Sequence, residues 1–275
     1  MKPNASAPSP APVSIEATPF DDGALYDLLC AGLDYGFDFY LGLAKAARGP
    51  VLDVCCGTGR ILLPCLQAGV DIEGLDLFPA MLARLREKAA ALGRQPVLHE
   101  ANMTCFQLPR RYAFVMIPFN AFVHNLTADD QLTCLRSCRE HLLPGGLLAF
   151  DTAFPGPHWI GAASGTRHLE GELPHPETGL PVRMWDTRTF DRVNQLQHSF
   201  NEVEFLDAAG GVVSTHPSKT TLRWIYKGEM ELLLRVAGFA RWKILGSFDG
   251  RPLVNETDDM IVQAWTTDEP DVHRD

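Results

Sequence analysis

The chain has 275 residues, 46% of them hydrophobic, and its 34 acidic and 24 basic side chains give a formal net charge of −10. This length and composition allow one large globular domain with an inserted segment. An acidic chain without a dense Lys/Arg cluster argues against nucleic acid as a partner, and no apolar stretch reaches the roughly 18 residues that a membrane span needs. We therefore expect a small-molecule substrate, no nucleic acid and no membrane.

The seven cysteines include no C-x-x-C pair, which argues against a zinc ribbon or a redox motif. Cysteines without such spacing are typical of reduced core thiols, so we expect a cytoplasmic protein. The acidic and histidine residues form no pattern that predicts a metal site.

The first 19 residues are rich in Pro, Ala and Ser and predict a disordered tail. Residues 20–47 follow with apolar side chains near helical spacing. From Pro50 to Phe154, short apolar runs alternate with amphipathic segments, which predicts a parallel sheet covered by helices. The expected strands span 50–56, 70–77, 95–103, 110–119 and 147–154, and the expected helices span 60–69, 79–93 and 127–143.

The pattern changes from residue 155 to residue 227. Residues 155–181 are rich in Gly, Pro and His and predict a loop, and three β-patterned runs follow at 182–190, 196–207 and 212–226. A helix and two strands then return at 229–239, 240–248 and 258–267. We therefore predict an α/β fold with a doubly wound, seven-stranded, mostly parallel sheet. Its core is formed by 20–154 and 228–267, an antiparallel β insertion at 155–227 serves as a lid over the active edge, and 268–275 is a tail.

A glycine-containing turn directly after the first strand marks a cofactor site. The run Asp53-Val54-Cys55-Cys56-Gly57-Thr58-Gly59-Arg60 leaves a buried strand and opens a helix, where glycines let the backbone approach a ligand closely. Asp76 ends the neighbouring strand 23 residues after Asp53, and a carboxylate there can accept hydrogen bonds from both ribose hydroxyls of an adenosyl group. Leu62 occupies the place of the third glycine in a dinucleotide fingerprint, which favours a nucleoside cofactor without a pyrophosphate.

These segments resemble the class I S-adenosylmethionine (SAM)-dependent methyltransferases. VLDVCCGTGR, GLDLFPAML, HEANMTCFQL and YAFVMIPFNAFVHN resemble four successive family motifs, although Cys55 stands where Gly is usual, Asn102 where Asp is common and Ala113 where Asp often begins the fourth strand. The resemblance implies SAM as cofactor and S-adenosylhomocysteine as product. It implies cofactor contacts from Asp53, Cys55, Gly57, Thr58, Gly59, Arg60, Asp76, Leu77, Met81, Asn102, Met103 and Phe119.

Within that family, the likeness is to small-molecule N-methyltransferases of the glycine/sarcosine and amino-sugar type. LYDLLCAGLDY resembles their N-terminal helix, whose tyrosines lie near the methyl donor, so Tyr26 and Tyr35 are candidates there. NAFVHN resembles the stretch that carries an active-site histidine, which makes His124 the candidate base. We expect Asn120, Trp159, Arg188 and Tyr226 to contact the substrate.

Three alternatives stay open from the sequence. The methyl group could go to oxygen or carbon instead of nitrogen, since the same sheet serves all three reactions. The fold could belong to an NAD-dependent oxidoreductase or to a non-catalytic SAM-binding protein. A homodimer is also possible through edge strands of the lid.

Overall fold

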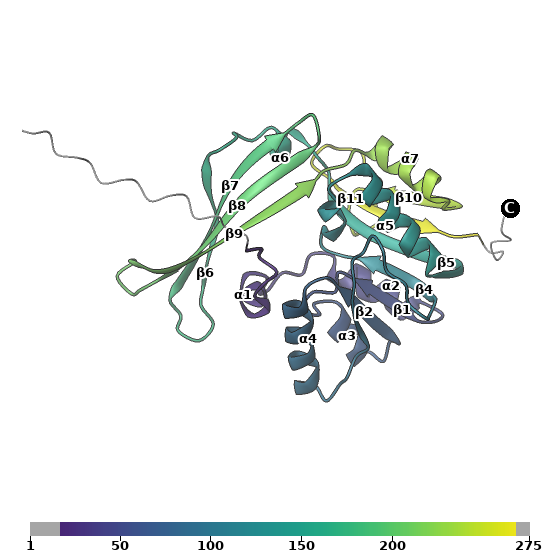
Figure 1. Cartoon of the computed structure of the whole chain (residues 1–275), viewed down its shortest axis with the longest axis horizontal. Helices are drawn as coiled ribbons and strands as arrows, with labels where there is room; N and C mark the ends of the chain where they lie inside the picture. Colours follow the sequence, from purple (N-terminus) through teal and green to yellow (C-terminus); the bar gives the residue numbers. More distant parts are fainter. Residues whose placement is uncertain (1–16, 268–275) are drawn as a thin grey trace, which may run out of the picture.

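Two sheets carry the fold of the computed structural model, which describes residues 17–267 (Figure 1). Sheet A has seven strands in the order β10-β11-β5-β4-β1-β2-β3, and only β11 runs against the others. The bounds are β1 Val51–Val54, β2 Ile72–Asp76, β3 Leu98–Glu100, β4 Tyr112–Ile117, β5 Leu142–Ala153, β10 Arg241–Leu245 and β11 Asp259–Trp265. The predicted seven-stranded, mostly parallel sheet is confirmed.

Helices cover both faces of sheet A, so each face is buried. On one face α5 (Ala128–Glu140) and α7 (Lys227–Ala237) pack on Leu52 and Val54. On the other, α2 (Phe37–Ala46), α3 (Leu62–Gln67) and α4 (Pro79–Ala91) pack on Val51. This double burial explains why the strand sequences are continuously apolar.

Local sequence signals set the helix ends. Asp22 caps α1 (Gly23–Leu29), and Thr127 caps α5 by accepting a hydrogen bond from the backbone N–H of Asp130. Pro79 occupies the first turn of α4, and Gly238 ends α7 in a left-handed conformation. The single helical stretch expected over 20–47 is divided, because Gly32 and Gly36 adopt positive φ between α1 and α2.

Sheet B is the antiparallel insertion, formed by β6 (Arg167–Pro174), β7 (Pro181–Asp191), β8 (Leu196–Leu206) and β9 (Val212–Arg223). A short helix α6 (Pro157–Ile160) precedes it. The antiparallel insertion is confirmed, but the loop predicted over 155–181 was wrong at β6, which pairs with β7 along its length.

Sheet B stands to one side of sheet A, with α1 between sheet B and α4 (Figure 1). The chain segment before α1 runs along β9, since the N–H of Lys219 donates to the carbonyl of Ala17 at 2.9 Å. The predicted tails at 1–19 and 268–275 lie outside the described residues except for 17–19. Within residues 17–267 no helix combines the length and apolar character needed to cross a bilayer.

Candidate active site

A pocket of about 480 Å³ lies at the carboxyl ends of β1, β2 and β4. The strand order turns back between β1 and β4, which is where doubly wound sheets bind their ligands. The loops after β1, β2, β3 and β4 line it, together with the segment before α1 and residues of β9. Ten predicted site residues line this pocket: Tyr26, Cys55, Gly57, Asp76, Leu77, Met81, Asn102, Met103, Phe119 and His124.

The carboxylate of Asp76 is held in one orientation by the backbone. Its two oxygens accept hydrogen bonds from the N–H groups of Gly57 at 2.8 Å and Phe78 at 2.9 Å. Burial raises the pKa of Asp76, although the hydrogen bonds from Phe78, Gly57 and Leu77 oppose that shift. Each oxygen keeps a second lone pair, so the carboxylate is suited to accept two hydroxyl hydrogen bonds from a ribose.

The loop after β1 depends on left-handed backbone. Cys55, Gly57 and Gly59 have φ values of 59°, 53° and 88°. A side chain at Gly59 would come within 2.9 Å of Leu85, so glycine is required there. Cys55 accepts the same conformation with a side chain, at a cost of about 1 kcal/mol, and this is the position where the sequence departs from the family motif.

The wall beyond β2 and β3 is suited to an adenine ring. Met81 is buried, and the sulfur atom of Met103 lies 3.8 Å from that of Cys55. The side-chain oxygen of Asn102 accepts hydrogen bonds from the backbone N–H and hydroxyl of Thr104, both at 2.9 Å. The amide NH₂ of Asn102 is therefore the group left to face a base, a role that replaces the acceptor role of an aspartate.

A cluster of buried polar side chains, which includes Arg60 and Asp53, lies beside the pocket near the loop after β1. The Nη1 of Arg60 donates to the carbonyl of Tyr35 at 2.8 Å, and its guanidinium covers the ring of Phe119 at 4.7 Å. Arg60 Nη2 and Asp53 Oδ1 are buried and make no hydrogen bond within the described part of the chain. Burial raises the pKa of Asp53 to about 8, with Arg60 acting to lower it.

These buried atoms without hydrogen-bond partners are complementary in charge to the amino-acid end of SAM. A buried carboxylate and a buried guanidinium complement an ammonium and a carboxylate, which are the two charges of the methionine moiety. The buried Oδ1 of Asn120 and hydroxyl of Tyr35 also lack a well-formed hydrogen bond among residues 17–267. The pocket thus offers groups suited to the ribose and adenine of SAM, and the buried polar atoms beside it complement the charges of the methionine end.

Asp151 of β5, which no sequence pattern marks as a site residue, holds the loop after β4. Asp151 is fully buried and accepts hydrogen bonds from the N–H groups of Phe119 at 2.9 Å and Asn120 at 2.8 Å, and from the hydroxyl of Tyr40 at 2.5 Å. Burial raises its pKa to about 6 against these hydrogen bonds. Phe119 and Asn120 have φ values of 62° and 57°, so the carboxylate stabilises a strained turn at the pocket.

His124 also lines the pocket. It ends a short 3₁₀ helix, η1 (Ala121–His124), and the ring of Phe20 meets its imidazole edge to face at 5.2 Å. Desolvation lowers the pKa of His124 to about 4, so the imidazole is neutral at pH 7. Burial raises the pKa of Tyr26 well above its ordinary value, so its hydroxyl keeps its proton.

The other predicted site residues lie away from the pocket. Thr58 donates its hydroxyl to Asp27 at 2.6 Å, and Tyr35 and Asn120 belong to the cluster of buried polar side chains beside the pocket. In the insertion, Trp159 donates to Gln197, Arg188 pairs with Asp186 and Glu170, and Tyr226 packs against Phe154. The structure thus lends no support to a substrate role for Trp159, Arg188 or Tyr226.

Other residues line the pocket that no sequence motif predicts. Phe20 packs on Phe78 at 5.0 Å and on His124, and Thr18, Lys219, Thr220 and Thr221 also line the pocket. No local motif marks these residues, since they meet only when the insertion folds back over sheet A. Within residues 17–267 no group of three or more His, Cys, Asp or Glu side chains could hold a metal ion.

The strand order of sheet A, and the pocket at the point where that order turns back, are those of a class I SAM-dependent methyltransferase. Comparison with known proteins agrees, because residues 51–146 match the family described as a methyltransferase domain. The chain therefore carries a methyltransferase domain, and the protein is a SAM-dependent methyltransferase that acts on a small molecule.

Three relatives extend the match beyond that domain. The dTDP-3-amino-3,4,6-trideoxy-alpha-D-glucopyranose N,N-dimethyltransferase of Streptomyces venezuelae is 27% identical over 85% of this chain and 96% of its own length. The cypemycin N-terminal methyltransferase of a Streptomyces species is 24% identical over 77% of this chain and 81% of its own. The solved CcbJ methyltransferase of Streptomyces caelestis is 26% identical, with a TM-score of 0.71 over 92% of this chain and 99% of its own.

Proposed function

We propose that the protein transfers the methyl group of SAM to an amine nitrogen, and that the acceptor is an amino sugar. The observation that carries this proposal is the similarity to an amino-sugar N,N-dimethyltransferase along 96% of that protein's length, which includes the insertion as well as the cofactor domain. The second relative is also named for methylation at an N-terminus, again an amine.

The chemistry requires little from the protein besides the position of the reactants. SAM supplies an activated methyl on a sulfonium, which an in-line nucleophile displaces. An amine must be unprotonated to attack, and the product ammonium loses a proton. The imidazole of His124, whose pKa of about 4 keeps it neutral at pH 7, has a free nitrogen that can accept a hydrogen bond from the amine N–H and orient its lone pair toward the methyl group, and the released proton passes to water.

The surroundings of His124 support the same assignment. Phe20 and Phe78 exclude water on one side, and the Tyr26 hydroxyl, which also lines the pocket, stays protonated and can orient a polar group. Asp53, Arg60 and Asp76 bind the cofactor, and Asp151 acts through the backbone of Phe119 and Asn120 to hold the turn that leads to His124.

A pair of matched acceptors tests the proposal. A dTDP-linked 3-amino sugar and the same nucleotide sugar with a hydroxyl in place of the amine are incubated with the enzyme and SAM, and products are followed by mass spectrometry. We expect one or two added methyl groups on the amino sugar and none on the hydroxyl analogue. Methylation of the hydroxyl analogue alone would favour an O-methyltransferase.

Compartment and assembly follow as further parts of the proposal. All seven cysteines are free, which suits a reducing cytoplasm. Strand β6 forms an outer edge of sheet B, so two copies pairing there would give the homodimer. Sedimentation of the purified enzyme distinguishes monomer from dimer.

A further inference from the structure

Helix α1 closes the pocket although it is only seven residues long. Tyr26 on this helix and Thr18 and Phe20 just before it all line the cavity. An isolated helix of this length is not stable in water, so contacts with the rest of the protein must hold it in place. The position of this wall therefore depends on what ties α1 to sheet A and its helices.

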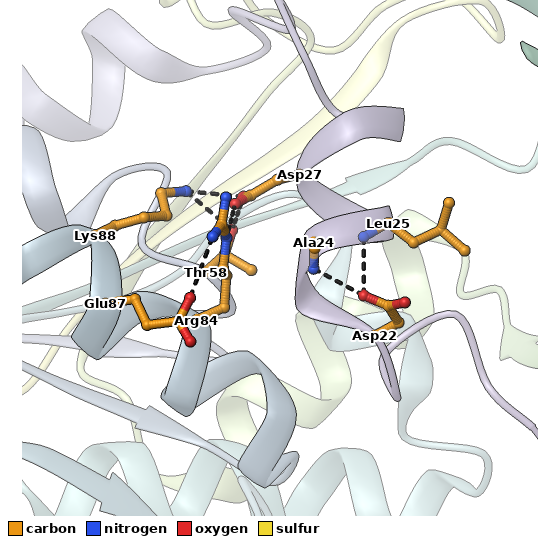
Figure 2. Close-up of polar contacts among 8 residues, drawn as sticks. All are labelled: Asp22, Ala24, Leu25, Asp27, Thr58, Arg84, Glu87 and Lys88. Carbon is orange, nitrogen blue, oxygen red and sulfur yellow. Dashed lines mark hydrogen bonds and ion pairs between the residues drawn. The ribbon is translucent and has the colours of Figure 1, made fainter. Parts of the chain in front are cut away.

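A set of polar contacts between α1 and other elements is centred on one carboxylate, that of Asp27 (Figure 2). Asp27 Oδ1 accepts from the hydroxyl of Thr58 at 2.6 Å and from Lys88 Nζ at 2.8 Å. Asp27 Oδ2 accepts from Arg84 Nε at 2.7 Å. Thr58 belongs to the cofactor loop after β1, whereas Arg84 and Lys88 belong to α4, so one side chain joins three separate elements.

The cluster is charged and only partly shielded from solvent. The side chain of Asp27 is 21% exposed, and those of Arg84 and Lys88 are 37% and 31% exposed. Burial acts to raise the pKa of Asp27, but hydrogen bonds from Lys88, Thr58 and Arg84 outweigh it and leave that pKa below its ordinary value. The carboxylate is ionised at neutral pH.

A second feature brings α1 close to α4. Gly23 at the start of α1 is buried, and a Cβ there would lie 2.6 Å from the Cβ of Arg84 and 3.0 Å from the carbonyl oxygen of Ala80. The glycine thus permits the approach that brings Asp27 within reach of Arg84 and Lys88. Asp22 fixes the first turn of α1 by accepting from the N–H groups of Ala24 and Leu25.

We propose that Asp27 is a positioning residue that latches α1 onto the cofactor loop and thereby sets how long SAM stays bound. Asp27 does not line the pocket itself. It acts through Thr58 on the cofactor loop, and through Tyr26 and Phe20 on the pocket wall. The inference concerns cofactor retention and holds whatever acceptor the enzyme uses.

The test measures the dissociation rate of SAM by stopped flow in the full-length enzyme and in Asp27→Asn. We expect the rate to rise at least about tenfold, since the replacement removes the two ion pairs that Asp27 makes with Arg84 and Lys88 and weakens its hydrogen bond with Thr58. The matched control is Glu87→Gln, because Glu87 pairs with Arg84 on the exposed side of α4 and does not reach α1. This control should dissociate SAM at the wild-type rate.

Ionic strength separates a latch from a general structural role. Salt screens partly exposed ion pairs, so the wild-type dissociation rate should increase with salt, whereas the rate of Asp27→Asn should depend on it much less. Lys88→Met keeps the contact between Asp27 and Arg84, so its SAM dissociation rate should lie between those of the wild type and Asp27→Asn. This variant also tests the proposal if Asp27→Asn does not fold. An unchanged dissociation rate in both variants, or an equal rise in Glu87→Gln, would overturn the proposal.

Discussion

The two halves of the pocket are built by different means. The cofactor half consists of short loops at the ends of β1, β2 and β4, and buried carboxylates hold these loops through backbone N–H groups, as Asp76 holds Gly57 and Asp151 holds Asn120. The half that we propose for the acceptor, called the acceptor half, consists of side chains from segments far apart in sequence, such as Phe20, His124 and Lys219. The first half depends on local backbone geometry and the second on how the chain packs.

This difference has a functional consequence. Backbone-defined loops around a buried sheet leave little freedom for the ligand, which suits a cofactor that never changes. Walls made from side chains on an inserted sheet and an N-terminal segment can change without disturbing sheet A, which suits an acceptor that differs between relatives. Substitutions should therefore separate cofactor binding from turnover according to the half they fall in.

The largest effect is expected at His124 in the acceptor half. His124→Ala and His124→Phe should lower kcat by roughly 10²-fold, because each removes the imidazole nitrogen that orients the amine, while SAM affinity by calorimetry stays near that of the wild type. His124→Phe retains an aromatic ring against Phe20, so equal losses in both variants would assign the effect to the imidazole nitrogen.

The pH profile adds an independent reading for His124. Its pKa of about 4 means that the imidazole is charged only below that pH, so the acid limb due to this group should lie near pH 4 and should be missing in His124→Phe. His168→Ala on exposed β6 serves as the control. Wild-type turnover in His124→Ala would remove the residue from the mechanism.

The next effect is expected at Asp76 in the cofactor half. Asp76→Ala should weaken SAM binding by about 1–3 kcal/mol, since it removes the ribose acceptor and also frees the N–H groups of Gly57 and Phe78. Calorimetric titration with SAM measures the loss. Asp71→Ala, at an exposed carboxylate that pairs with Arg110 just before β2, should bind SAM as the wild type does. Unchanged affinity in Asp76→Ala would mean that the ribose lies elsewhere.

The same contrast explains what the sequence could and could not predict. Sheet A and the cofactor loop have local signatures, namely apolar runs, the glycines around Thr58 and an acidic residue at the end of β2, so they were predicted from pattern alone. Strand β6 has no such signature, because its sequence RHLEGELP is polar and largely exposed and becomes a strand only by pairing with β7. Asp151 was missed for a related reason, since its partners Tyr40, Phe119 and Asn120 lie at least 31 positions away in the chain.

The acceptor half shows more clearly what cannot be predicted from the sequence. Aromatic and basic residues of the insertion are natural candidates for a substrate wall, yet Trp159, Arg188 and Tyr226 make their contacts within the protein. Lys219, which gave no signal in the sequence, lines the pocket because β9 folds back over sheet A. Only tertiary packing distinguishes these two sets of residues.

A smaller effect sharpens the account of the cofactor half. Asp53 has a pKa of about 8 in the free protein because it is buried, so it carries a proton at pH 6.5. The ammonium of SAM is also protonated at that pH and should stabilise the ionised carboxylate, so binding should release up to about one proton. Calorimetric titration with SAM in two buffers of different ionisation enthalpy measures the number of protons released. Asp53→Asn should bind SAM without this release, and equal release from that variant would assign the proton to another group.

The smallest effect is expected at Lys219 on the acceptor wall. Lys219 is the one Lys or Arg among the described residues that line the pocket, and none of the ion pairs among residues 17–267 involves it, so it is available for an anionic group of the acceptor. If the acceptor is a nucleotide sugar, Lys219→Met should raise its KM by about two- to fivefold, the range expected for an exposed charge pair, while SAM affinity stays constant. High salt should reduce the difference between variant and wild type, because the interaction is exposed. Lys227→Met, just beyond β9 and outside the pocket, controls for the loss of one positive charge. An unchanged KM for a diphosphate-linked acceptor would show that its phosphates do not contact β9, and would restrict the acceptor half to the region around Phe20 and His124.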